Sequence, residues 1–204
     1  MESLEIEVKF FLFDLDAVRD RILELGAYSA GRLFETNIRF EDRANSLLEK
    51  KALLRLRKDR RAKLTYKCKP AVSDVDYKIF NELEVEVSDF TKMRQILESL
   101  GYHKEQIYEK WRESYTLKGT DCCIDEMPFG NFLEIEGNKK EIKDVAAEIG
   151  MQWERRILLN YLEMFEILRS KLNLPFTDIT FDNFRDVGLD LKAFLPLMES
   201  RNKK

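Results

Sequence analysis

The chain has 204 residues, of which 44% are hydrophobic and 11% aromatic, so it can bury a core of its own and a disordered chain is excluded. Its 35 lysines and arginines nearly balance 38 aspartates and glutamates, so no overall field favours DNA, RNA or an anionic membrane. No segment resembles a secretory signal or the roughly 18 apolar residues of a membrane span, which predicts a cytoplasmic protein without a membrane partner.

The supply of histidine, cysteine and glycine excludes several kinds of site. His103 is the only histidine, so histidine-dependent triads and histidine-rich metal sites are excluded. The three cysteines have neither the spacing of a zinc site nor that of a disulfide framework. The glycine-rich loops that bind phosphates through backbone N–H groups are also missing. A phosphate site in this protein must therefore be built from side chains.

The first predicted strand begins almost at the first residue, in "LEIEVKFF". Glu5, Glu7 and Lys9 alternate with apolar residues, which is the pattern of a strand with one charged and one apolar face. A helix follows over residues 14–26 and is predicted to end at Gly26 in a left-handed cap. Residues 35–40 then read as the next strand.

Strands with alternating charges recur through the rest of the chain. Residues 52–70 form a predicted basic hairpin, and residues 82–87 form an acidic strand followed by a helix over 89–101. A basic strand around Trp111 and an acidic hairpin over 122–136 come next, followed by a helix over 139–150. The strand, helix and strands of the first part repeat in the second, which predicts a pseudosymmetric sheet.

The charged strand faces can lie outside or inside the folded sheet. If they lie outside, as in an ordinary carrier barrel, the apolar faces fill the lumen and the amphipathic helices have no apolar surface to cover. If they lie inside, every helix finds a partner. We therefore predict an α+β fold, an antiparallel eight-stranded closed β-barrel that is covered outside by helices and whose lumen, a tunnel, is charged.

A lumen that contains both acidic and basic side chains suits a ligand that combines negatively charged groups with a bound cation. Phosphate oxygens bind arginine and lysine, and hard divalent cations bind carboxylates, so a polyphosphate with Mg²⁺ or Mn²⁺ fits. Nucleic acid fits less well, because the acidic residues would repel its backbone and the aromatic residues fall mainly on the apolar faces.

These motifs resemble those of the CYTH superfamily, also called triphosphate tunnel metalloenzymes. "EIEVKF" matches its Glu-x-Glu-x-Lys motif, and "LLRLRK", "KLTYK", "ELEVEV", "EKWRESY", "CCIDEMPFGNFLEIEG" and "NYLEMF" resemble later blocks of the family in order. The resemblance implies Mg²⁺ or Mn²⁺ as cofactor and Glu5, Glu7 and Lys9 as catalytic residues. It implies as metal ligands Glu5, Glu7, Glu134 and Glu136, with Glu84, Glu86 and Asp125 as further candidates. It implies as triphosphate-binding residues Lys9, Arg55, Arg57, Lys67, Lys110 and Arg112.

The chain departs from the family pattern in two strands. Asn37 and Arg39 stand where the family often has an acidic and an aromatic residue, and Arg39 is added to the expected triphosphate contacts. Phe80 stands where the family usually has a basic residue, which removes one expected phosphate contact. The substrate itself is therefore left open.

The resemblance leaves several activities open. Hydrolysis of tripolyphosphate, thiamine triphosphate or a nucleoside triphosphate is preferred because no adenine-reading element is seen. The alternatives are a class IV adenylyl cyclase, which makes cyclic AMP and pyrophosphate from ATP, and a non-catalytic polyphosphate or nucleotide sensor.

The C-terminal part is predicted to be helical. Residues 1–170 are expected to form the tunnel domain, and residues 171–204 a helical extension packed on or beside the barrel. That extension would cap the barrel or form a dimer contact, so both a monomer and a homodimer are open. The basic tail at 201–204 is expected to be solvated.

Overall fold

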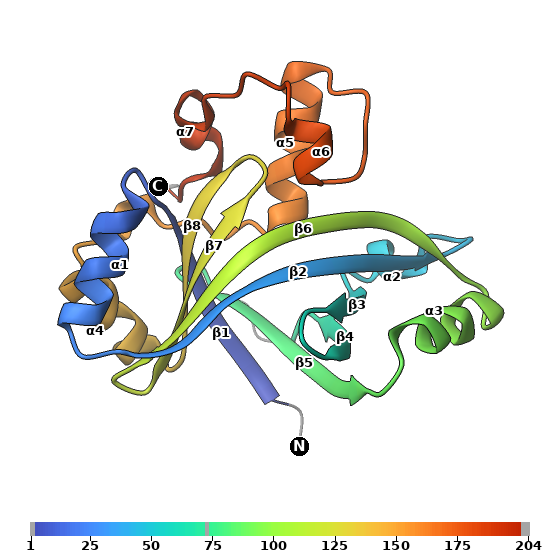
Figure 1. Cartoon of the computed structure of the whole chain (residues 1–204), viewed down its shortest axis with the longest axis horizontal. Coiled ribbons are helices and arrows are strands. Elements are labelled where there is room, and N and C mark those ends of the chain that lie inside the picture. Colours follow the sequence, from blue (N-terminus) through green and yellow to red (C-terminus); the bar gives the residue numbers. More distant parts are fainter. Residues whose placement is uncertain (1–2, 72–73, 201–204) are drawn as a thin grey trace.

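The computed structural model describes residues 3–71 and 74–200, and within them eight strands close into a barrel (Figure 1). Around the barrel the order is β1-β5-β4-β3-β2-β6-β7-β8, and every neighbouring pair is antiparallel. The strands are β1 (Ser3–Phe11), β2 (Tyr28–Asp42), β3 (Leu53–Lys58), β4 (Ala62–Cys68), β5 (Lys78–Val87), β6 (Tyr102–Leu117), β7 (Thr120–Met127) and β8 (Gly130–Glu136).

Helices lie outside this barrel (Figure 1). The larger ones are α1 (Leu15–Glu24), α3 (Phe90–Ser99), α4 (Lys139–Ile149) and α5 (Tyr161–Leu172). Short helices complete the fold, namely α2 (Ser46–Glu49), α6 (Phe181–Phe184), α7 (Leu195–Met198) and the 3₁₀ turns η1 (Trp153–Arg155) and η2 (Leu191–Ala193). In the described part of the chain, none of the helices has the length and apolar character needed to span a membrane.

The alternation within the strands decides what faces the lumen. Val8 and Phe10 of β1 point outward and pack with Ile22 of α1 and Ile142 of α4, and all four are almost fully buried. Glu7 and Lys9 of the same strand point inward and line the cavity. The same alternation holds on β3, where Leu56 packs with Leu97 of α3 and Arg57 lines the cavity. The predicted barrel with a charged lumen and a helix-covered exterior is thus confirmed.

The two halves of the barrel begin with the same unit, a strand, a helix and a long strand. Asp14 caps α1 by accepting a hydrogen bond from the Ala17 N–H, and Asp89 caps α3 in the same way from Lys92. Both helices end just before a glycine with positive φ, Gly26 at 85° and Gly101 at 94°, as the sequence predicts. The long strands that follow, β2 and β6, pair with each other along most of their length.

The helical cover is incomplete on one side. The outer side chains of Leu83 and Val85 on β5 are more than half exposed, as is that of Leu4 on β1. Helix α3 packs beside this face, against β3 and β6, and leaves it open.

The C-terminal segment packs on the barrel through an apolar cluster. Phe165 and Leu168 of α5 and Leu195 of α7 meet Phe132 of β8 in this cluster. Isolated backbone bridges join Ile157 to both Lys9 and Glu199, so the end of the described chain is tied to the first strand. The division of the chain at residue 170 stays a prediction, and the tail at 201–204 lies outside the described residues.

Candidate functional site

The barrel encloses a cavity of about 1220 Å³ that is lined by side chains from all eight strands and by residues of α2 and α5. Twelve residues predicted from the sequence line it, namely Glu5, Glu7, Lys9, Arg39, Arg55, Arg57, Lys67, Glu84, Lys110, Arg112, Glu134 and Glu136. Residues that are far apart in the sequence therefore meet in one chamber with two signs of charge. Such a chamber suits a ligand that carries its own charges.

Two of the predicted residues do not line the cavity. Asp125 is fully buried in the wall, where it contacts Lys110 and Arg112. Glu86 lies near the end of β5 with its side chain half exposed, and it forms an ion pair with Arg61 at 2.8 Å.

Carboxylates crowd one part of the cavity. Burial raises the pKa of Glu5 to about 7 against the opposing charge of Lys67, and the nearby Glu7 and Glu82 add to the rise. Burial and the charge of Glu7 likewise raise the pKa of Glu136 to about 7. Both shifts show that further negative charge is unfavourable here without an added cation.

Lysines compensate part of this negative charge. Lys67 contacts Glu5 at 2.5 Å, and Lys78 forms an ion pair with Glu7. Burial acts to raise the pKa of Glu7, but Lys78 and Lys9 outweigh it and lower that pKa to about 2. Lys78 was not predicted as a site residue, although it shares strand parity with Phe80 and Glu82 and therefore their inward face.

A second cluster surrounds Asp125. Arg112 donates two hydrogen bonds to its carboxylate, from Nε at 2.7 Å and from Nη2 at 2.6 Å, and Lys110 donates a third at 2.9 Å. The Tyr161 hydroxyl of α5 donates a fourth at 2.9 Å. Asp125 therefore holds both cations in fixed positions at the cavity wall.

Lys9 lies beside this cluster and is almost fully buried. Its ammonium group forms an ion pair with Glu134 and lies 4.3 Å from the centre of the Tyr161 ring. The sequence placed Tyr161 in the block "NYLEMF" and in the helical C-terminal part, but it did not predict this contact.

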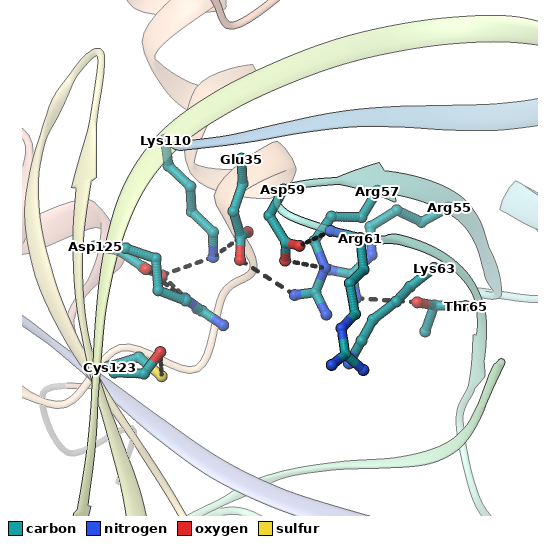
Figure 2. A network of polar contacts seen from close by, with 12 residues as sticks. Glu35, Arg55, Arg57, Asp59, Arg61, Lys63, Thr65, Lys110, Cys123 and Asp125 are labelled. Atoms are coloured by element: carbon teal, nitrogen blue, oxygen red, sulfur yellow. Dashed lines mark hydrogen bonds and ion pairs between the residues drawn. The ribbon is translucent and has the colours of Figure 1, made fainter. Parts of the chain in front are cut away.

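Figure 2 shows a third group, in which Glu35 of β2 lies between Lys110 and Arg57. The nearest oxygen–nitrogen distances are 3.6 Å to Lys110 and 3.3 Å to Arg57. Burial acts to raise the pKa of Glu35, but Lys110, Arg112 and Arg57 lower it to about 2. Glu35 was also missed, although it alternates with Asn37 and Arg39 on the same strand face.

The cavity contains suitable ligands for a divalent cation, but they are not arranged as a metal site. Its carboxylate oxygens are the ligands that Mg²⁺ and Mn²⁺ prefer. Among the described residues, however, no three Asp, Glu, Cys or His side chains are arranged closely enough to bind a metal ion. Several of the carboxylates contact lysines or arginines, so these contacts would have to rearrange for a cation to bind.

Comparison with known proteins gives consistent results. A model of the CYTH domain matches residues 3–183. A Methanocaldococcus jannaschii protein whose name marks it as a candidate adenylate cyclase is 31% identical over 153 residues, which are 73% of this chain and 86% of that protein. A solved Pyrococcus horikoshii structure is 28% identical with a TM-score of 0.66 and covers 77% of this chain and 96% of its own.

A third similar structure is that of a protein from Hippeastrum. Its solved structure has a TM-score of 0.57 at 20% identity, over 82% of this chain and 96% of that one. That protein is described as a candidate adenylyl cyclase with a dominant triphosphatase activity. At this identity the likeness shows the fold alone.

Proposed function

Because the chain belongs to the CYTH domain family, we propose that it binds a triphosphate in the barrel cavity and hydrolyses it with a divalent metal ion. The observation that carries this proposal is the chamber itself, where cations and carboxylates from all eight strands face one another. A protein gains little stability from so many buried charges, whereas a triphosphate and its metal ion would use both signs.

The basic residues would bind the phosphate oxygens. Lys110 and Arg112 are pre-positioned by Asp125, so little conformational entropy is lost when they bind an anion. Lys9 would exchange part of its contact with Glu134 for a phosphate oxygen. In each case the cation would neutralise negative charge that develops as the phosphoryl group transfers.

The carboxylates would hold the metal ion. Glu5, Glu7, Glu134 and Glu136 are the proposed ligands, and the crowding that raises the pKa of Glu5 and Glu136 supports this choice. When bound, the ion would neutralise phosphate oxygens and lower the pKa of a bound water that attacks phosphorus. Asp125 already accepts hydrogen bonds from three side chains, which supports a positioning role for it rather than metal binding.

Adenylyl cyclisation is the second candidate, favoured by the name of the Methanocaldococcus relative. The two reactions differ in their products. Hydrolysis releases orthophosphate, while cyclisation of ATP gives cyclic AMP and pyrophosphate in equal amounts. Incubation with Mg²⁺ or Mn²⁺ and, separately, tripolyphosphate, thiamine triphosphate and ATP should release orthophosphate from at least one substrate. Cyclic AMP and pyrophosphate as the main products would overturn hydrolysis and establish the cyclase.

The Glu7→Gln variant tests the metal site. It keeps the size of the side chain but removes a charged ligand, so we expect metal-dependent turnover to fall about a hundredfold or more. Glu98→Gln on α3 removes the same charge on the outer surface and should leave turnover unchanged. Tight binding of tripolyphosphate without product from the wild-type protein would instead indicate a sensor.

A further inference from the structure

Lysines already occupy the neighbourhood of the proposed metal ligands. The ion pairs are Glu5 with Lys67 at 2.5 Å, Glu7 with Lys78, and Glu134 with Lys9. Each ammonium group is a cation that a carboxylate accepts in place of a metal ion. A divalent cation that enters the empty cavity therefore meets carboxylates that are paired already.

Glu136 is the one proposed ligand outside this pattern. Within residues 3–71 and 74–200 it forms no ion pair with a lysine or an arginine. A single carboxylate binds a divalent cation only weakly, since such ions take several oxygen ligands. Glu136 is therefore not enough to hold a metal ion while the other carboxylates keep their lysines.

Lys78 is the lysine of this group that is fixed most firmly. It is the register partner of Glu7 across the β1–β5 pair, so the pairing of the two strands places both side chains together. Its ammonium group also lies 5.1 Å from the centre of the Phe80 ring on the same strand. Its side chain is only 17% exposed. An anion on one side and an aromatic face on the other hold the charge in place.

Phe80 and Lys78 belong together in this arrangement. Phe80 is the residue that departs from the family pattern, in which a basic residue is usual at that position. Its ring lines the cavity and contacts an ammonium group that comes from two residues earlier on the same face of β5. The positive charge on this strand is thereby moved to Glu7.

A lysine beside a carboxylate opposes a divalent cation in two ways. It occupies a carboxylate oxygen that the metal ion would use, and its own charge repels the incoming ion. This repulsion is screened little inside a cavity, because few solvent ions enter it. A triphosphate changes this balance, since it brings several negative charges into the same space.

We propose that Lys78 is an internal counter-ion that keeps a divalent cation away from Glu7 while the cavity is empty, so that the metal ion binds together with the triphosphate and not before it. The preference of Mg²⁺ for one or two carboxylates together with substrate phosphates agrees with this order. The inference rests on the proposed function in one respect, that Glu5, Glu7 and Glu134 are metal ligands.

The first test measures Mn²⁺ binding without any triphosphate. Isothermal titration calorimetry compares the wild type with Lys78→Met, which keeps an unbranched side chain but removes its charge. We expect the dissociation constant for Mn²⁺ to fall at least about tenfold in the variant, because the competing charge is gone. Lys140→Met is the matched control, since Lys140 pairs with Asp144 at 2.9 Å on α4 and is exposed. It should change the constant less than about twofold.

A double variant tests where the additional Mn²⁺ binds. Lys78→Met combined with Glu7→Gln lacks both the counter-ion and the carboxylate, so its affinity for Mn²⁺ should return to that of the wild type or below. A gain that survives Glu7→Gln overturns the proposal. The same dissociation constant for Lys78→Met and Lys140→Met also overturns it.

A measurement on the wild-type protein does not depend on how these variants fold. The imido analogue of tripolyphosphate, which resists hydrolysis, is titrated once in Mn²⁺ and once in a metal chelator. We expect at least about tenfold tighter binding in Mn²⁺, although Mn²⁺ alone binds weakly. Equal affinity in the two buffers overturns the coupled binding. Circular dichroism checks the fold of Lys78→Met, and Lys78→Gln replaces it if it is unfolded.

The outcomes also separate this inference from the proposed hydrolysis. A gain of Mn²⁺ affinity in Lys78→Met, with no orthophosphate from the wild-type protein, keeps the counter-ion and rejects hydrolysis. Metal-dependent hydrolysis by the wild type, with no gain of Mn²⁺ affinity in Lys78→Met, keeps the function and rejects the counter-ion.

Discussion

At the scale of single residues, the cavity is a set of charges that are compensated to different degrees. Lys9 is only 2% exposed, and its charge is compensated by an ion pair with Glu134 and a cation–π contact with the Tyr161 ring. Glu35 is 3% exposed, and its negative charge is compensated by Lys110 and Arg57. Removing one partner from such a group leaves the other buried without compensation, which costs more than the pair contributes.

Glu35 gives a prediction for the dependence of stability on pH. Its pKa is about 2 in the folded protein and 4.5 in the unfolded chain, so the native state favours the ionised form. This stabilisation is complete above pH 4.5 and is lost as the pH falls towards 2; at pH 7 it is on the order of 3 kcal/mol.

We therefore expect Glu35→Gln to lower the free energy of unfolding at pH 7, and the difference from the wild type to shrink as the pH falls below 4.5. Urea unfolding at pH 7, 5 and 3.5 measures this. A constant difference across that range would show that the charge of Glu35 is not what stabilises the fold.

The alternation within each strand predicted which residues share a face, and only the resemblance to the CYTH family assigned roles to them. Glu5, Glu7 and Lys9 are adjacent positions on one face, so their shared direction is a local property. Glu35, in the middle of β2, and Lys78, the first residue of β5, obey the same rule but lie outside the recognised motifs. Tyr161 reaches the cavity from a helix, and its contact with Asp125 depends on long-range packing that no local pattern encodes.

At the scale of elements, the helices outside the barrel differ in how deeply their apolar side chains are buried. Ile142 of α4 is fully buried, while Ile96 of α3 is 51% exposed. The same side chain on two covering helices thus occupies very different environments, although both helices show a similar periodic pattern in the sequence.

This pair gives a matched stability test. Ile142→Ala should destabilise the protein by about 2–5 kcal/mol, because it loses buried contacts and leaves a cavity. Ile96→Ala should change stability by less than about 1 kcal/mol, since little area is buried and alanine is the better helix former. Chemical denaturation measures both, and equal losses would contradict the observed packing of α3.

The elements themselves were largely predictable, because charged and apolar residues alternate in the strands and glycines follow the helices at Gly26, Gly101 and Gly150. The exposed face of β5 was not predictable. The sequence shows that Leu83 and Val85 share an apolar face, but whether a helix lies over that face depends on how α3 packs against β3 and β6.

At the scale of the whole molecule, the closed barrel leaves no free strand edge among the described strands. The C-terminal segment is tied to this barrel at several places. Ile157 bridges to Lys9 and Ile179 bridges to Tyr108. Within the segment itself, the Ser200 N–H donates to the Arg156 carbonyl at 2.8 Å. Two of these attachments are on strand residues whose side chains line the cavity.

The contacts of Tyr161 with Lys9 and Asp125 connect helix α5 to charged residues of the cavity and of its wall. An anion that binds Lys9 and Lys110 would hold both side chains in place against Tyr161. Local opening of α5 would then cost more free energy, so we expect the backbone amides of α5 to exchange hydrogen with solvent more slowly. Hydrogen–deuterium exchange with and without tripolyphosphate should therefore show protection in α5 and little change in α3, which does not line the cavity. Equal protection of both helices would show that α5 is only a cover. By thermodynamic reciprocity, substitutions that destabilise the packing of α5 on the barrel would lower the affinity of the cavity for its ligand, although they lie outside the β-sheet.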